Sequence, residues 1–334
     1  MEKAIMELKK VPTGKLIVHS CLGILAGVTI VPGLALGNLL YNHALNRKYD
    51  RINFNNQPSE DSETVPQECP AQNVFVQDSD SEWAEIFETR KEREITSYDG
   101  LTLRAYQLGD NSAKRQVIMV HGYGGDHLMY RQLAKHFYKT GFSILMPDLR
   151  GHGKSEGNVI CMGWKDRLDI IKWIDLLVSE NPRCEIVLYG ISMGAATVMM
   201  TSGEKLPDNV KAIIEDCGYT SAAEQFGYCM KTFFNIVPFP ILQYSNLVCR
   251  IRGGWGFWQA SAVKQLNKNY LPMLFIHGAD DDFVPAFMID KVYAATMGPK
   301  EKLIVPGAKH AEACCVDPEG YGRAVEGFLK KYID

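Results

Sequence analysis

The sequence predicts an α/β protein with an open, mostly parallel eight-stranded sheet and helices on both of its faces. Short apolar or β-branched runs alternate with stretches of helical periodicity from about Trp83 to the C-terminus. Most of these runs are far enough apart for a helical crossover, which parallel strands require. The chain has 334 residues, which is long enough to bury a full core.

The elements follow in order. The turn Asp99-Gly100 predicts a hairpin between the first two strands. Apolar residues on one face from Ile170 to Val178 predict a helix, and Asp317-Pro318 predicts the capped start of the last helix. The eight expected strands are residues 94–98, 101–108, 116–120, 143–146, 185–189, 211–215, 273–277 and 302–305. Ligands of such a sheet bind at the carboxyl ends of its strands, so we expect the chemistry in the loops there.

Composition excludes several classes of protein. The formal net charge of −3 does not suit a protein that binds nucleic acid through a basic surface. The cysteines, nine in number, include no C-x-x-C pair, so neither a disulfide scaffold nor a zinc ribbon is expected. The sequence also lacks H-E-x-x-H, and we expect no metal and no cofactor.

The N-terminal segment, residues 1–48, is predicted to be a membrane anchor or a signal segment. Residues 16–46 contain no Asp, Glu, Lys or Arg, and an uncharged stretch of this length can span a bilayer as a helix. A cleaved signal peptide with a small-x-small site at residues 35–37 is the alternative, but the run is long for one. We therefore expect a single N-terminal span that anchors the protein in a membrane, without deciding which side the rest of the chain faces. The spacings Gly23-x-x-x-Gly27 and Gly33-x-x-x-Gly37 would let two such helices approach each other closely, although chance spacing of the four glycines is the simpler interpretation.

Residues 49–85 are predicted to be an acidic, extended linker. From residue 50 onward this stretch contains nine acidic residues, with Arg51 as its one basic residue, and Asn, Gln, Ser and Pro between them. The remainder, residues 86–334, is expected to be one domain with a cap insertion at about 218–271.

A candidate nucleophile stands at the centre of Gly190-Ile191-Ser192-Met193-Gly194. A strand run precedes this G-x-S-x-G pattern and a helical run follows it, the context of a nucleophile elbow. The glycines are needed because the sharp turn leaves no room for Cβ atoms. We expect Ser192 to be the catalytic nucleophile.

A serine hydroxyl needs a base, and the base needs an acid. His310 follows the last strand run, whereas His277, at the end of a strand, is expected to be structural. The acid has four candidates by position, which are Asp280, Asp281, Asp282 and Asp216. Three adjacent carboxylates cannot all be buried and ionised, so we expect one to face His310 and the others to face water or to cap backbone amides.

Five motifs in this order resemble the α/β-hydrolase superfamily. They are His121 to Gly125, Asp148 to Ser155, Gly190 to Gly194, His277 to Pro285 and Gly307 to His310. From about Arg93 onward the chain resembles the bacterial serine-aminopeptidase-like and monoacylglycerol-lipase-like branch. In that branch the acid comes four residues after the histidine of H-G-x-x-D-x-x-V-P, which implies Asp281.

The resemblance implies acyl transfer by Ser192, His310 and Asp281. The backbone N–H of Met193 is expected to be one oxyanion donor and that of Tyr123 the other, with Gly124 as the alternative to Tyr123. Asp148, Arg150 and His152 are expected to brace the loop beside the nucleophile.

The cap insertion bears on the substrate. It is rich in aromatic residues, which suits an acyl or aryl group, and residues 222–271 contain five basic residues and one acidic residue, Glu224. We expect a carboxylesterase-like or lipase-like serine hydrolase acting on small-molecule esters with small to medium acyl groups or on lipid-like esters. A serine aminopeptidase on short peptides and a non-catalytic binding protein with a hydrolase fold are the alternatives. The oligomeric state stays open.

Overall fold

The computed structural model describes residues 31–48 and 81–333. Within them the sheet has eight strands in the order β1-β2-β4-β3-β5-β6-β7-β8. The first two strands pair with each other in antiparallel fashion, as does β2 with β4, and all the other pairs are parallel. The strands are β1 (Lys91–Thr96), β2 (Thr102–Leu108), β3 (Arg115–Val120), β4 (Ser143–Pro147), β5 (Glu185–Ile191), β6 (Val210–Asp216), β7 (Met273–Gly278) and β8 (Lys300–Val305). The predicted eight-stranded, mostly parallel sheet is confirmed.

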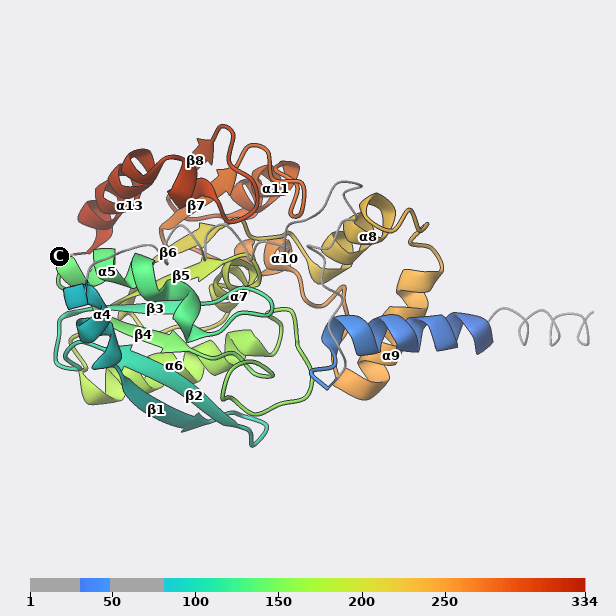
Figure 1. Ribbon diagram of the computed structural model, residues 1–334, viewed down its shortest axis with the longest axis horizontal. Helices are drawn as coiled ribbons and strands as arrows, with labels where there is room; N and C mark the ends of the chain where they lie inside the picture. The colour runs from blue at the N-terminus through green and yellow to red at the C-terminus, as the bar shows by residue number, and fades with distance from the viewer. Residues whose placement is uncertain (1–30, 49–80, 334) are drawn as a thin grey trace, which may run out of the picture.

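Helices cover both faces of the sheet, as predicted (Figure 1). One core contains Trp173 of α6 and Leu266 of α10, and the other contains Trp83 of α4, Phe137 of α5 and Phe328 of α13. The described helices of the domain are α4 (Ser81–Glu88), the 3-10 turn η1 (His127–Tyr130), α5 (Arg131–Lys139), α6 (Asp166–Glu180), α7 (Met193–Thr201), α8 (Ala222–Thr232), α9 (Ile241–Gly253), α10 (Ala262–Leu266), α11 (Phe287–Ala295), α12 (Ala313–Val316) and α13 (Pro318–Tyr332). Successive strand residues enter opposite cores, as the pleat requires: Ile118 of β3 lies in the first and Met119 in the second.

The predicted cap of the last helix and the predicted turn between the first two strands are both present. The Asp317 side chain accepts a hydrogen bond from the Gly320 N–H and caps α13, whose first residue is Pro318. Gly100 adopts a φ of 87° in the turn between β1 and β2, a conformation that glycine tolerates without strain.

The uncharged N-terminal segment packs on protein. Residues 31–45 form a helix beside α9 at the end of the molecule that carries the cap helices α8 and α9 (Figure 1). Tyr41 and Leu45 are 2% and 1% exposed, and a Cβ on Gly37 would lie 2.8 Å from the backbone nitrogen of Ser245 in α9. Arg47 then donates hydrogen bonds to the carbonyls of Gly153 and Ser155.

The predicted membrane span is therefore corrected, together with the membrane-anchored localisation and the membrane partner. Across residues 31–48 and 81–333, every helix falls short of the length and hydropathy that crossing a bilayer requires. From residue 31 onward, several of the apolar residues that suggested an anchor, among them Tyr41 and Leu45, are instead buried in the protein. Residues 16–30 of the expected span lie outside the described residues.

The range expected to be a linker ends in a helix. Residues 81–85 belong to α4, where Trp83 and Phe87 are buried, and the Trp83 indole N–H donates to the Arg131 carbonyl. Residues 49–80 lie outside the described residues.

Candidate active site

The sharp turn at Ser192 joins β5 to α7. Ser192 has a φ of 57°, a conformation that L-residues seldom adopt, and it is 9% exposed. A Cβ on Gly190 would lie 2.3 Å from the Gly194 carbonyl oxygen, and one on Gly194 would lie 1.7 Å from the Val120 carbonyl oxygen. Both glycines are therefore sterically required, and together they raise Ser192 at the carboxyl end of a central strand.

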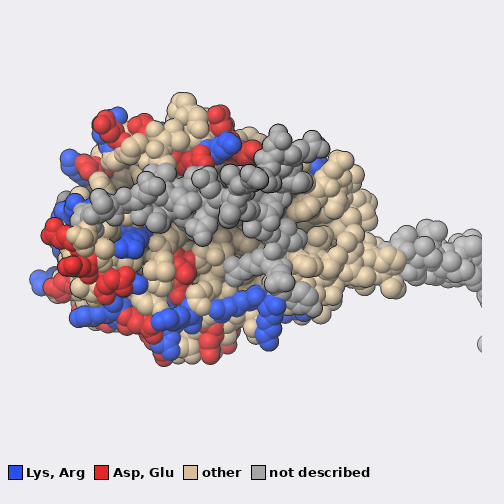
Figure 2. All heavy atoms as spheres, in the orientation of Figure 1, with Lys and Arg blue, Asp and Glu red and all other residues tan. Residues whose placement is uncertain are grey.

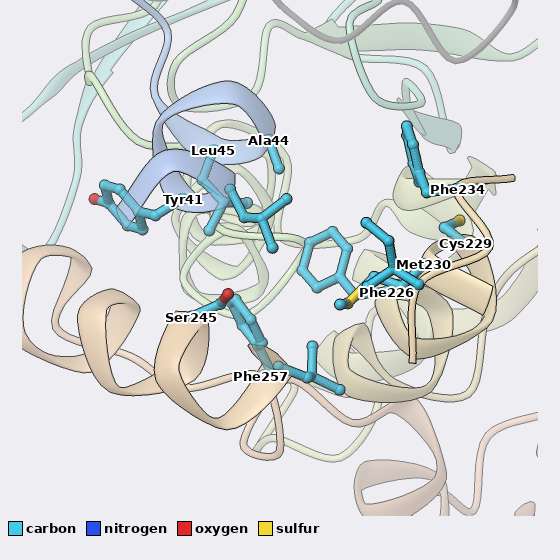
Figure 3. A pocket seen from close by; sticks show the side chains of 12 residues that line it. Tyr41, Ala44, Leu45, Phe226, Cys229, Met230, Phe234, Ser245 and Phe257 are labelled. Atoms are coloured by element: carbon cyan, nitrogen blue, oxygen red, sulfur yellow. The ribbon is translucent and has the colours of Figure 1, made fainter. Parts of the chain in front are cut away.

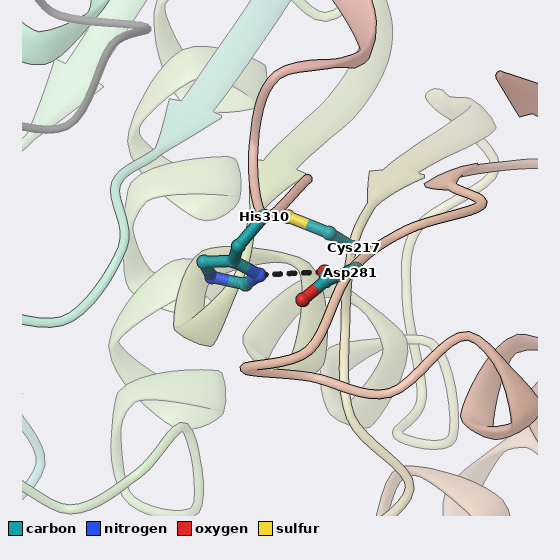
Figure 4. Close-up of side chains that lie close together, drawn as sticks. All are labelled: Cys217, Asp281 and His310. Atoms are coloured by element: carbon teal, nitrogen blue, oxygen red, sulfur yellow. Dashed lines mark hydrogen bonds and ion pairs between the residues drawn. The ribbon is translucent and has the colours of Figure 1, made fainter. Parts of the chain in front are cut away.

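The structure brings Ser192, His310 and Asp281 together. His310 Nε2 lies 2.9 Å from Ser192 Oγ, and His310 Nδ1 lies 2.7 Å from Asp281 Oδ2. Figure 4 shows the imidazole and the carboxylate facing each other, each from a loop after a strand. The other oxygen of Asp281 accepts hydrogen bonds from the backbone N–H groups of Phe283 and Val284. Burial raises the pKa of the Asp281 carboxyl, but the nearby His310 and His277 outweigh it and hold the pKa below its usual value.

The other acid candidates lie elsewhere. The side chains of Asp280 and Asp282 are exposed. Asp216 is buried and accepts a hydrogen bond of 2.9 Å from the Tyr321 hydroxyl. Burial raises the pKa of Asp216 to about 6.

His277 contacts the same carboxylate, which sequence reasoning missed. Its Nε2 lies 2.8 Å from the Val284 carbonyl oxygen and 3.3 Å from Asp281 Oδ2, and the ring is fully buried at the end of β7. The signal was present in the four-residue spacing of His277 and Asp281 across one tight loop. A histidine at a strand end therefore also helps to hold the acid in place.

The loop after β3 lies beside the nucleophile. A Cβ on Gly122 would lie 3.4 Å from Ser192 Cβ, so the loop backbone passes close to the serine. The Gly124 N–H donates a hydrogen bond of 3.2 Å to His152 Nε2. This N–H was the expected alternative to that of Tyr123 as an oxyanion donor, and His152 already engages it. Met193 is the first residue of α7, where backbone N–H groups have no partner within the helix.

The segment from Asp148 to Ser155 braces this loop. Asp148 accepts hydrogen bonds from the His127 and Lys154 N–H groups, and the Leu149 N–H donates to His121 Nε2. Arg150 binds Asp169 through two of its nitrogens and also pairs with Asp99. These contacts fix the loop without adding a group to the reacting centre.

The Cys217 side chain lies close to both Asp281 and His310. In the part of the chain that the structure describes, only Cys217, Asp281 and His310 bring three such ligand atoms within 4.8 Å of one another (Figure 4). Burial raises the pKa of the Cys217 thiol well above its usual value, which disfavours the thiolate that a metal would bind. His310 and Asp281 are also hydrogen-bonded to each other, so we assign no metal to this group.

A cavity opens above Ser192. Its walls include Tyr123 and Met193, the cap residue Phe226 and Ala44 of the N-terminal helix, and none of the described residues that line it carries a charge. On the face drawn in Figure 2, charged residues gather over the sheet, whereas the cap end of the molecule is almost free of them. The geometry therefore joins a serine, an imidazole and a carboxylate beneath an uncharged chamber.

Comparisons with known proteins agree with this architecture. Residues 111–237 match a family model described as serine aminopeptidase, S33. The uncharacterized protein YqkD of Bacillus subtilis is 27% identical over 256 residues, covering 75% of this chain and 84% of YqkD. The esterase Pf2001 of Pyrococcus furiosus superposes with a TM-score of 0.60 at 24% identity, over 73% of this chain and 92% of the esterase. An acylaminoacyl peptidase of Pyrococcus horikoshii superposes with a TM-score of 0.55 at 18% identity, over 72% of this chain and 41% of the peptidase.

The sheet order, the turn at Ser192 and these similarities lead to one assignment. The chain has the α/β-hydrolase fold.

Proposed function

We propose that this protein is a serine hydrolase that cleaves carboxylic esters through an acyl-enzyme. The observation that carries the proposal is the contact of His310 with both partners, 2.9 Å to Ser192 Oγ and 2.7 Å to Asp281 Oδ2. These are hydrogen-bond distances, and the order serine, base, acid is the one that a nucleophile relay needs.

The proposed reaction has two halves. Ser192 Oγ attacks the ester carbonyl carbon while its proton passes to His310 Nε2, and Asp281 stabilises the resulting imidazolium through Nδ1–H. The tetrahedral oxyanion accepts hydrogen bonds from the backbone N–H groups of Tyr123 and Met193. Collapse breaks the ester C–O bond, and the leaving alkoxide takes the proton from His310. Water then attacks the acyl-enzyme with His310 again as base, which releases the acid and restores Ser192.

An uncharged substrate suits the chamber better than a peptide with a free amino terminus. An aminopeptidase needs an acidic group that binds the substrate amine, and the described residues lining the cavity above Ser192 include no carboxylate. The charged side chains of the cap, within residues 222–271, are five basic ones and one acidic one, Glu224. The esterase activity in the name of Pf2001 and the apolar walls favour an ester.

The test is labelling and turnover by the full chain. A fluorophosphonate probe is expected to label the wild type and not Ser192→Ala, and the wild type is expected to hydrolyse p-nitrophenyl butyrate. Ser202→Ala is the matched control, because Ser202 bonds to the Met199 carbonyl at the far end of α7. Equal turnover by Ser192→Ala and the wild type would refute the nucleophile. Hydrolysis of aminoacyl p-nitroanilides without ester hydrolysis would favour the peptidase, and absence of labelling would favour a binding protein.

A further inference from the structure

Two cavities meet at the end of the N-terminal helix. The inner one contains Ser192, and the outer one lies between the N-terminal helix, α8 and α9. Ala44, Phe226 and Cys229 line both, so the outer cavity begins where the inner one ends. Figure 3 shows Leu45 and Ala44 of the N-terminal helix across the outer cavity from Phe226 and Met230 of α8.

The outer cavity is apolar. Its walls include Leu40, Met230, Leu242 and Phe257, and the hydroxyl of Ser245, which also lines it, already donates to the Ile241 carbonyl. Its empty volume is about 620 Å³, its opening to solvent included, against about 440 Å³ for the inner cavity. A chamber with such a lining favours apolar groups over polar ones and can bury an apolar chain of several carbons.

The helix that closes this chamber is fixed to the domain at three points. The Arg252 side chain of α9 donates to Asn38 at 2.5 Å and to Asn42 at 2.9 Å, and its guanidinium lies over the Tyr41 ring. The Tyr123 hydroxyl donates to the Ala44 carbonyl. At the last residue of the helix, the Leu45 carbonyl accepts a hydrogen bond from the Ile160 N–H. These contacts fix the position of the N-terminal helix relative to the loop beside Ser192.

We propose that residues 40–45 form one wall of an acyl-chain pocket and set the acyl length that the enzyme prefers. The acyl group of the ester occupies the outer cavity, with its carbonyl at Ser192 and its chain passing between Ala44 and Phe226. This inference rests on the proposed ester hydrolysis and names the substrate class for it, an ester with a medium-length unbranched acyl chain. The selectivity comes from a segment outside the strands and helices of the hydrolase domain.

Leu40 gives a clean probe, because it lines the outer cavity and not the inner one. Leu39, its neighbour on the same helix, is 50% exposed and provides the matched control. We would measure kcat/KM of the full chain for p-nitrophenyl acetate, butyrate, octanoate and decanoate, in the wild type, Leu40→Phe, Leu40→Ala and Leu39→Phe.

The wild type is expected to prefer octanoate to acetate by about tenfold or more, because each buried methylene adds to transition-state binding. Leu40→Phe fills the cavity and is expected to lower the octanoate-to-acetate ratio about tenfold. Leu40→Ala is expected to shift the optimum towards decanoate, and Leu39→Phe to keep the wild-type ratio.

The outcomes separate the two proposals. Absence of ester hydrolysis by the wild type, with no fluorophosphonate labelling, overturns the proposed function. Ester hydrolysis whose chain-length profile is the same in the wild type and in both Leu40 variants overturns the acyl pocket alone. Should Leu40→Phe fail to fold, as shown by circular dichroism, the profile of Leu40→Ala decides, because removing methyl groups beside an existing cavity does not overpack it.

Discussion

The Tyr123 hydroxyl donates a hydrogen bond of 2.7 Å to the Ala44 carbonyl and so joins the N-terminal helix to the loop beside Ser192. The two residues are 79 positions apart in the sequence. Both also line the cavity above Ser192. A single contact therefore connects the wall of the chamber to a loop proposed to supply an oxyanion donor.

Tyr123→Phe removes this contact and keeps the ring. We expect the free energy of unfolding to fall by about 1 kcal/mol, the net value of one such hydrogen bond. We also expect kcat for a p-nitrophenyl ester to fall by up to about tenfold, because the loop backbone loses a restraint. Urea denaturation and steady-state kinetics measure both quantities. Tyr138→Phe, at a partly exposed ring on α5, is the control, and equal behaviour of the two variants would contradict the coupling.

Asp281→Asn tests the acid. The amide cannot balance the imidazolium charge and can present an N–H to His310, so kcat is expected to fall by about 1,000-fold or more with little change in KM. Asp280→Asn and Asp282→Asn, at exposed neighbours, are expected to stay within about twofold of the wild type. A large loss in Asp216→Asn with normal turnover by Asp281→Asn would move the role to Asp216.

Gly194→Ala tests the steric origin of the turn. The new Cβ would lie 1.7 Å from the Val120 carbonyl oxygen, so we expect the variant to lose more than about 3 kcal/mol of stability or to fail to fold. Gly322→Ala is the matched control, because a Cβ there meets no atom within 4 Å and the residue lies inside α13. That variant is expected to gain up to about 1 kcal/mol. Urea denaturation of both checks the pair, and similar stabilities would refute the argument.

The sheet could be predicted from sequence because strand patterning is local. All eight strands begin and end within three residues of their expected positions, and the largest difference, three residues, is at the start of β1. Lys91, Glu92 and Arg93 begin β1 with no apolar alternation. Pairing with β2 makes them a strand, and at a sheet edge such charged residues are well tolerated.

The packing of the N-terminal helix on the domain could not be predicted, because an uncharged sequence suits burial in protein as well as burial in a membrane. The spacing of Gly33 and Gly37 suggested contact between two such spans, whereas in the structure both glycines lie against α9 of the same chain. A Cβ on Gly33 would lie 2.3 Å from the Tyr244 ring. Asn38 and Asn42 carried the missing information, since both accept from Arg252. That pairing spans more than two hundred residues and is invisible to local patterns.

The parts of the candidate site whose backbone is fixed by a short sequence motif could be predicted. The parts that depend on tertiary packing of side chains could not. The glycines around Ser192 and the loop that carries His310 follow from short patterns. By contrast, the contact of His277 with Asp281 and the joining of Tyr123 to Ala44 depend on side-chain directions across loops. Residues 40–45 enter the pocket only through tertiary packing.

Behind the site, Glu215 is a fully buried carboxyl at the end of β6. One of its oxygens accepts a hydrogen bond of 2.9 Å from the Gly218 N–H. Burial raises the pKa of Glu215 from 4.5 to about 8, although the nearby His277 opposes the shift. The folded protein therefore holds a proton here at neutral pH that the unfolded chain releases.

Glu215→Gln should change how stability depends on pH. Between about 4.5 and 8 the folded state binds more protons than the unfolded state at this residue, so the free energy of unfolding of the wild type falls as the pH rises. The raised pKa values of Asp216 and His277 act with the same sign; the causes of the Asp216 shift remain in the variant, whereas His277 loses the contribution of Glu215 to its own shift. The variant is therefore expected to gain stability relative to the wild type progressively as the pH rises from about 4.5 to 8. Urea denaturation at pH 5, 6, 7 and 8 measures this, with exposed Glu319→Gln as the control for loss of one charge. A difference between Glu215→Gln and the wild type that is the same at every pH would show that Glu215 is ionised in the folded protein.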